Sequence, residues 1–174
     1  MTENTVYSQN VIEFVTVAVE TCIFLERTAE YSRADFVVKS TNLLSLLYAK
    51  TLLVAVPETL LDDAPERFVT EDDYRFVKER IETLLGNDNI YLEVFHSQIK
   101  YSDTPIAAFI SEDLADIYQE LKDFAANYRI GVADVMNDAL VLCLESFAEH
   151  WGQKTLNALR ALHALRYSDD FSDH

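Results

Sequence analysis

The scarcity of helix-breaking residues constrains the fold of this chain most strongly. Among its 174 residues are only three glycines and three prolines. Five of these six lie between segments in which apolar residues recur every three or four positions, which is the period of an α-helix. A chain so rarely interrupted is expected to be nearly all helical. The sequence therefore predicts an all-α, single-domain helical bundle of five to seven helices with a long C-terminal helix.

The apolar periodicity divides the chain into five helical segments. We predict helices over approximately residues 11–25, 34–55, 70–86, 111–128 and 132–167. Residues 43–47 are apolar almost all round, which predicts that the second helix is the buried member of the bundle. The single domain is expected to cover residues 1–167, and the acidic residues 168–174 are expected to fray.

Two connectors separate these helices. In residues 58–69, Leu60, Leu61 and Phe68 are expected to cap the end of the bundle. Residues 87–105 are harder to assign, because 90–95 alternate like a strand while the sequence offers no evident partner strand. We predict an ordered connector there.

Local signals fix several helix ends. Thr70 and Asp73 form a near capping box, and Ser111 is a suitable N-cap for the fourth helix. Gly152 lies inside the helical pattern of the last segment, which indicates either a kink or the close approach of another backbone.

Charge and composition exclude several classes of function. The net charge of −16 argues against nucleic acid and against anionic membrane surfaces, because both require clustered Lys and Arg. The most apolar run, residues 43–56, falls short of the ~20 residues that a membrane span needs. No signal peptide is evident, and Cys22 and Cys143 are predicted to be reduced core residues. We therefore expect a cytoplasmic protein.

The fourth and fifth segments hold the polar residues whose placement is most informative. Asp113 and Glu120 lie along the border between the apolar and acidic faces of the fourth helix, and Asp116 lies on the adjoining acidic side. Arg160 on the leucine-rich last helix needs a charge partner, for which Asp116 or Asp113 is the candidate. We predict that the two helices pack together through an ionic network that fixes their register. His150 could face Asp113 or Glu120 across the helix pair.

Two other side chains of the last helix are predicted to be structural. Trp151 should lie in the core with its indole N–H paired, and His163 should be a hydrogen-bonded core histidine.

A ligand site is the alternative interpretation of the same residues. It would bring six side chains to one cleft, where they could bind a small ligand or a metal: Glu93, Asp113, Asp116, Glu120, His150 and Arg160. Metal sites in helical bundles normally use paired Glu-x-x-His repeats, and only one such motif, Glu93 to His96, occurs here. No phosphate-binding glycine loop or nucleophile motif is present. We predict no cofactor and no metal.

Three motifs together resemble a known family. They are Tyr-Leu-Glu-Val-Phe at 91–95, Asp-Leu-Ala-Asp-Ile-Tyr at 113–118, and His-Trp-Gly at 150–152 followed by Ala-Leu-Arg-Ala-Leu-His at 158–163. The chain resembles DUF5063, an all-helical bacterial domain-of-unknown-function family common in Bacteroidetes. The family tends to carry Asp-Pro where this chain has His96-Ser97, and His where it has Lys154. The resemblance implies the helical fold and a cytoplasmic location, and it leaves the function open.

The sequence thus favours a protein without catalysis. Surplus apolar helix faces indicate a protein-interaction or scaffolding module that binds an unidentified protein partner or forms a homodimer. The alternative is the small-ligand or metal-binding protein, conceivably an enzyme, described above.

Overall fold

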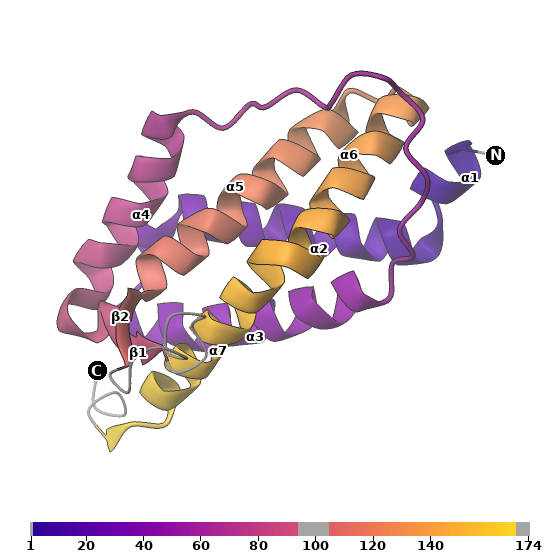
Figure 1. The fold of residues 1–174 in the computed structure, drawn as a ribbon. Helices are drawn as coiled ribbons and strands as arrows, with labels where there is room; N and C mark the ends of the chain where they lie inside the picture. Colours follow the sequence, from indigo (N-terminus) through magenta and orange to yellow (C-terminus); the bar gives the residue numbers. More distant parts are fainter. Residues whose placement is uncertain (1, 94–104, 170–174) are drawn as a thin grey trace.

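The computed structural model describes residues 2–93 and 105–169, and within them the chain forms a helical bundle, as predicted (Figure 1). The elements in chain order are α1 (Thr2–Val6), α2 (Gln9–Glu26), α3 (Arg33–Leu52), α4 (Glu71–Leu85), β1 (Ile90–Glu93), β2 (Ile106–Phe109), α5 (Ile110–Arg129), α6 (Ala133–Ser146) and α7 (Gly152–Arg166). Short 3₁₀ turns follow α2 and α4. No described helix is long and apolar enough to cross a membrane.

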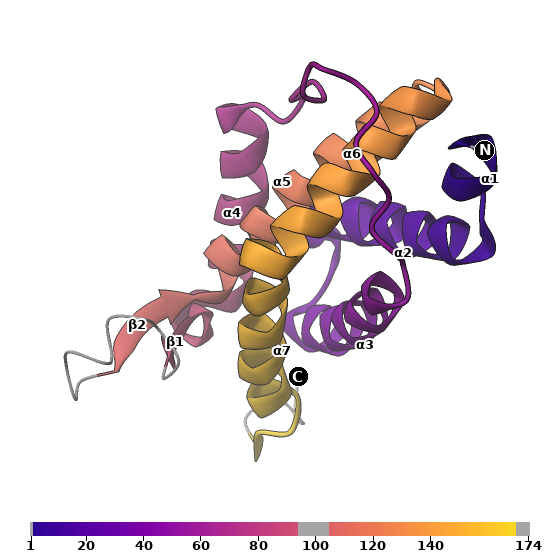
Figure 2. The same ribbon diagram turned by 45° about the vertical axis from the view of Figure 1, so that its right-hand side comes forward.

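Helix α5 is the central element of the bundle. It packs against α2, α4, α6 and α7, so its apolar stripe has neighbours on several sides (Figures 1 and 2). Leu114, Ile117 and Leu121 on this stripe are completely buried. The contact between α5 and α7 confirms the predicted pairing of the fourth and fifth segments.

Helix α3 is not the fully buried member that its composition predicted. Leu44 and Leu47 are buried, but Leu46 is 45% exposed. Helix α3 packs mainly against α2 and α7, which cover only part of its circumference. An apolar residue on the remaining face therefore meets solvent, and the prediction from residues 43–47 was wrong.

A two-stranded antiparallel sheet includes part of the segment that was predicted to be an ordered connector without a partner strand. β1 pairs with β2 in the register Ile90 with Phe109 and Glu93 with Ile106. The partner strand was missed because its sequence, Ile-Ala-Ala-Phe, lacks an alternating pattern and runs directly into α5. The intervening residues 94–104, which include His96 of the Glu-x-x-His motif, lie outside the described residues, as do residues 170–174 of the predicted tail.

Helices α6 and α7 are joined by a π-helical turn, Phe147–Trp151. A Cβ atom on Gly152 would lie 2.5 Å from the carbonyl oxygen of Phe147, so glycine is required at this point. Trp151 is fully buried, and its Nε1 donates to the Cys143 carbonyl at 2.9 Å. The core position of Trp151 was predicted. At Gly152 the sequence left a kink and a close approach of another backbone open, and the backbone that comes close is that of the preceding turn.

The two helix starts that carried N-cap predictions differ in outcome. The Thr70–Asp73 capping box is present, as predicted. Ser111, however, lies inside α5, which begins at Ile110. Its backbone N–H donates to Asn89 Oδ1 at 2.8 Å and its hydroxyl accepts from Asn89 Nδ2 at 2.9 Å, so Ser111 joins the turn after α4 to α5.

Both cysteines are free and buried, as predicted. Burial raises the pKa of Cys22 to about 12 and raises that of Cys143 well above its ordinary value. Neither thiol is therefore a reactive thiolate near neutral pH.

Candidate functional site

The six predicted site residues do not converge on one cleft. Asp113 and Asp116 belong to a network between α5 and α7, and Glu93 and Arg160 line a hollow beside β1. Glu120 lies on α5 near Arg67, and His150 lies in the exposed π-helical turn. No group of three or more His, Cys, Asp or Glu side chains that could hold a metal ion occurs within residues 2–93 and 105–169.

The network centres on Lys154 of α7. Its Nζ lies 3.0 Å from Asp116 Oδ2 and 3.7 Å from Asp113 Oδ1, both on α5. The Tyr74 hydroxyl of α4 donates to Asp116 Oδ1 at 2.7 Å, and the Tyr91 hydroxyl of β1 donates to Asp113 Oδ2. One chain of polar contacts therefore links α4, α5, α7 and the small sheet.

The predicted ionic network thus exists, but its cation was assigned wrongly. Lys154, rather than Arg160 or His150, bridges the carboxylates. Arg160 and His150 are both exposed, and so is His163, whose ring contacts that of Tyr167 at a tilt of 56° with centroids 4.9 Å apart. The prediction that His163 is a core histidine was wrong, because α7 buries the face that carries the following residues: Gly152, Thr155, Ala158 and Leu162.

Burial gives the Asp113 carboxyl group unusual proton chemistry. The residue is only 3% exposed, and this desolvation raises its pKa to about 7, against the opposing effects of Tyr91 and Lys154. For Lys154, burial acts to lower the pKa, but Asp116 and Asp113 outweigh it, so the pKa is raised and the amine stays charged. Burial and the bonded carboxylates raise the pKa of Tyr74 and of Tyr91. The described acceptors and donors of the network are engaged with one another.

A hollow of about 190 Å³ lies beside this network, between β1 and α7. The polar residues of its lining are Tyr91, Glu93, Asn157 and Arg160. Asn157 Nδ2 donates to Glu93 Oε1 at 3.0 Å, so part of this polar lining is paired internally. The site keeps Glu93 and Arg160 together, as the ligand interpretation required, but separates them from Glu120 and His150.

A second feature is the long connection between α3 and α4, residues 53–69, which we call the strap. It crosses the bundle beside α5 and α6 without regular secondary structure (Figures 1 and 2). Asp138 of α6 accepts hydrogen bonds from the Leu60 and Leu61 backbone N–H groups, each at 2.8 Å. Burial alone would raise the pKa of Asp138, but these two donors lower it.

Further side chains of the bundle hold the rest of the strap. Asp123 Oδ1 accepts from the N–H groups of Phe68 and Val69 at 2.7 and 2.8 Å. Asn127 Nδ2 donates to the Glu66 carbonyl at 2.9 Å, and Asn137 Nδ2 donates to the Glu58 carbonyl at 2.8 Å. The four anchoring side chains, Asp123, Asn127, Asn137 and Asp138, are buried.

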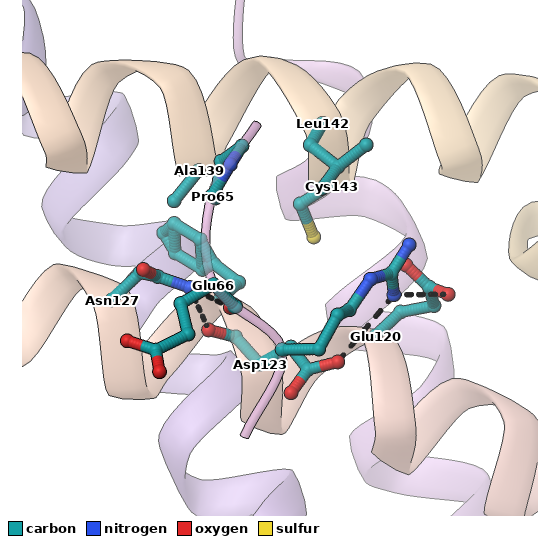
Figure 3. A pocket seen from close by; sticks show the side chains of 10 residues that line it. Pro65, Glu66, Glu120, Asp123, Asn127, Ala139, Leu142 and Cys143 are labelled. Atoms are coloured by element: carbon teal, nitrogen blue, oxygen red, sulfur yellow. Dashed lines mark hydrogen bonds and ion pairs between the residues drawn. The ribbon is translucent and has the colours of Figure 1, made fainter. Parts of the chain in front are cut away.

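Figure 3 shows where the strap crosses α5 and α6. Arg67 lies 3.4 Å from Asp123 and 3.6 Å from Glu120, so Glu120 is paired with the strap and not with α7. The sulfur of Cys143 points into the space between them (Figure 3). This cavity measures about 10 Å³, which is the room of a single water molecule, and it is no ligand site.

The anchored strap leaves its larger apolar side chains partly in solvent. Leu60, Leu61 and Phe68 are 48%, 40% and 39% exposed, so they do not cap the bundle end as predicted. The anchors themselves were missed by the sequence reasoning. The available signal was the polar pair Asn137-Asp138 inside the otherwise apolar α6, since buried polar groups need partners.

Comparison with known proteins places this fold. The model of the family described as domain of unknown function (DUF5063) matches residues 5–168. The chain belongs to the DUF5063 family. Its fold is similar to the crystal structure of protein BF1032 from Bacteroides fragilis, a structural genomics target, with 41% sequence identity and a TM-score of 0.85 over 94% of this chain and 96% of that one. A search of curated proteins found no match. The family assignment confirms the resemblance carried by the three motifs.

Proposed function

We propose that this DUF5063 protein is a protein-interaction module that docks its partner on the strap. The observation that carries the proposal is an ordered strap whose backbone is anchored by buried side chains while Leu60, Leu61 and Phe68 remain partly exposed. Ordering a backbone costs roughly 1–2 kcal/mol per residue. Burial of the strap's own leucines offsets little of that cost. Long ordered loops of this kind are commonly functional.

The strap also has the surface character of an interaction site. The partly exposed apolar side chains of the strap lie among exposed carboxylates: Glu58, Asp62, Asp63 and Glu66. Apolar groups rimmed by polar ones mark protein-binding surfaces. The bundle beneath the strap provides a rigid support, which reduces the ordering cost of association.

The geometry gives less support to a small-ligand or metal-binding protein. That function needs the six candidate residues around one cleft, whereas Glu120 and His150 lie apart from the other four. The Asp113 and Asp116 carboxylates are engaged by Lys154, Tyr74 and Tyr91. We therefore propose a binding role without catalysis, in the cytoplasm, where two free thiols would remain reduced.

Site-specific photo-crosslinking tests this function. A photoreactive amino acid replaces exposed Thr59 on the strap, and a control protein carries it at exposed Glu79 on α4. In cells of the source organism, Thr59 should give a discrete adduct with another protein that Glu79 does not give. Leu60→Ser with Leu61→Ser should abolish it. No adduct at Thr59, or the same adducts at both positions, would contradict the proposal.

A further inference from the structure

Two hollows flank the strap where it crosses α6. Their volumes are about 250 Å³ and about 270 Å³. Both are lined by the same central residues: Leu61, Asp63, Ala64, Pro65 and Asp138. The first extends along α6 to Val141 and Glu145, and the second extends to Ile130 and Val135. Together they form one surface, interrupted by the strap, which we call the strap groove.

The charge of the strap groove has a single sign. Its lining includes carboxylates from both the strap and α6, namely Asp62, Asp63, Glu66, Asp138 and Glu145. No Lys or Arg is among the lining residues of either hollow in the described part of the chain. Asp138 is engaged by two strap N–H groups, while Asp62, Asp63, Glu66 and Glu145 are exposed.

Apolar contacts are available at the same place. Leu61 lines both hollows, and Ile130, at the end of α5, is 50% exposed at the edge of the second. An occupant must therefore offer apolar side chains to either side of the strap and positive charge to its rim. An amphipathic helix with apolar residues at i, i+3 or i+4 and i+7, and with Lys or Arg beside them, has this arrangement.

We infer that the strap groove binds a basic, amphipathic segment of a partner protein; this inference rests on the proposed function and specifies the chemistry of the partner. A second copy of this chain is a poor occupant. Joining two strap grooves would bring the exposed carboxylates at Asp62, Asp63 and Glu66 against their own counterparts, and like charges across an interface are strongly unfavourable. The net charge of −16 strengthens that repulsion and attracts a basic segment.

A pair of synthetic peptides tests the inference on the full chain. One is a 15-residue helix with leucine on one face and lysine on the other, and the second replaces every lysine with glutamate. Binding is measured by fluorescence anisotropy at constant ionic strength. The Lys/Leu peptide should bind at least ~10-fold more tightly than the Glu/Leu peptide. Leu61→Gln should weaken its binding by about 5-fold or more, because a peripheral charge attraction alone does not need Leu61.

A matched pair of charge reversals separates a specific site from general attraction. Asp62→Lys with Asp63→Lys and Glu66→Lys changes the strap groove. The control, Glu20→Lys with Glu30→Lys and Glu79→Lys, gives the same net charge at exposed positions elsewhere. The first triple should weaken binding at least ~10-fold and the control less than ~3-fold. Circular dichroism and thermal unfolding verify that both variants fold.

The outcomes distinguish failure of the basic-segment inference from failure of the proposed protein-interaction function. Three results would overturn the basic-segment inference: an equal loss of affinity in both triple variants, equal binding of the two peptides, or no binding of either peptide. The same holds if ultracentrifugation shows a dimer of the unmodified chain that Leu61→Gln dissociates. A Thr59 adduct that persists in these cases would leave the interaction function standing with a different partner. Loss of that adduct would remove both.

Discussion

At the scale of single residues, Lys154 determines how α5 and α7 can pack. Asp113 and Asp116 lie about one helical turn apart on α5, and the side chain of Asp113 is only 5% exposed. A carboxylate so far from water requires a counter-charge or a proton. Lys154 reaches both groups while 30% of its side chain stays exposed. The charges of Asp116 and Asp113 outweigh the cost of partly burying the amine, so Lys154 compensates them in its charged form.

Replacing Lys154 with methionine should therefore destabilise the protein. We expect the free energy of unfolding to fall by about 1–3 kcal/mol, because Asp113 and Asp116 lose their shared cation while the aliphatic stem is kept. Urea unfolding followed by circular dichroism measures the change. The control Lys122→Met removes a more exposed pair with Glu26 at 3.0 Å and should cost less than about 1 kcal/mol.

A double-mutant cycle assigns the effect to the pair. Asp116→Asn in the Lys154→Met background should cost less than it does alone, with a coupling energy on the order of 1 kcal/mol. Additive effects of the two substitutions, or equal losses for Lys154→Met and Lys122→Met, would show that the network does not hold α7 in register.

At the scale of elements, the π-helical turn joins α6 and α7 into one continuous helical segment. The substitution Gly152→Ala would place a Cβ atom 2.5 Å from the Phe147 carbonyl oxygen, a backbone atom that cannot rotate away. We expect a loss of about 2 kcal/mol in the free energy of unfolding. Gln153→Ala, an exposed neighbour, should stay within about 0.5 kcal/mol. Equal urea midpoints for the two variants would contradict this account.

The strap is the second element whose structure depends on a few atoms. Asp138→Ala removes the acceptor for the Leu60 and Leu61 N–H groups, so these amides should exchange with deuterium at least ~10-fold faster. The amides of Phe68 and Val69, held by Asp123, should be much less affected. Asp134→Ala, an exposed carboxylate at the start of α6, is the control. Uniform acceleration along the chain would indicate global destabilisation instead.

The sequence predicted the elements that short-range periodicity determines. The apolar spacing of Leu114, Ile117 and Leu121 identified α5, and Thr70 with Asp73 identified the start of α4. It did not identify Lys154 as the partner of the α5 carboxylates. Several side chains of α7 were plausible partners, and only packing decides which one faces α5.

The strap and the small sheet escaped prediction for a related reason. The strap is positioned by Asp123 and Asp138, which lie far along the chain, and β2 is recognised as a strand through its pairing with β1. Contacts between distant segments leave no periodic trace in either one. The candidate site was therefore predicted only in part: the ionic contact between α5 and α7 was anticipated, and the surface used for the proposed function was not.

At the scale of the whole molecule, two sets of polar contacts join the helices around α5. The Lys154 network links α4, α7 and β1 to α5, and the strap links α3 and α4 to α5 and α6. Both depend on buried carboxyl groups, and the pKa values of these groups are shifted in opposite directions. Asp138 is held charged by N–H donors, whereas burial pushes Asp113 towards its protonated form. The free energy of unfolding should therefore fall at low pH, where Asp138 becomes protonated, and also at high pH, where Asp113 becomes ionised.

Raising the pH from 5 to 8 should lower the free energy of unfolding. The pKa of Asp113 is about 7 in the folded chain and 3.8 in its ordinary environment, so the folded chain keeps a proton that the unfolded chain has released. This stabilisation is complete below pH 3.8 and is lost as the pH rises through 7. Linkage gives a loss of at most about 2–3 kcal/mol over this interval. Urea unfolding at constant ionic strength measures it.

The variant Asp113→Asn isolates this effect from the rest of the titration. Self-repulsion in a chain of net charge −16 also grows with pH, but it acts on both proteins alike. The wild-type stability should therefore fall more steeply than that of Asp113→Asn between pH 5 and 8. Below pH 3.8 both proteins should lose stability, because protonation of Asp138 begins to release the strap. Parallel profiles above pH 5 would mean that Asp113 is already ionised in the folded chain, with Lys154 and Tyr91 sufficient to compensate its burial.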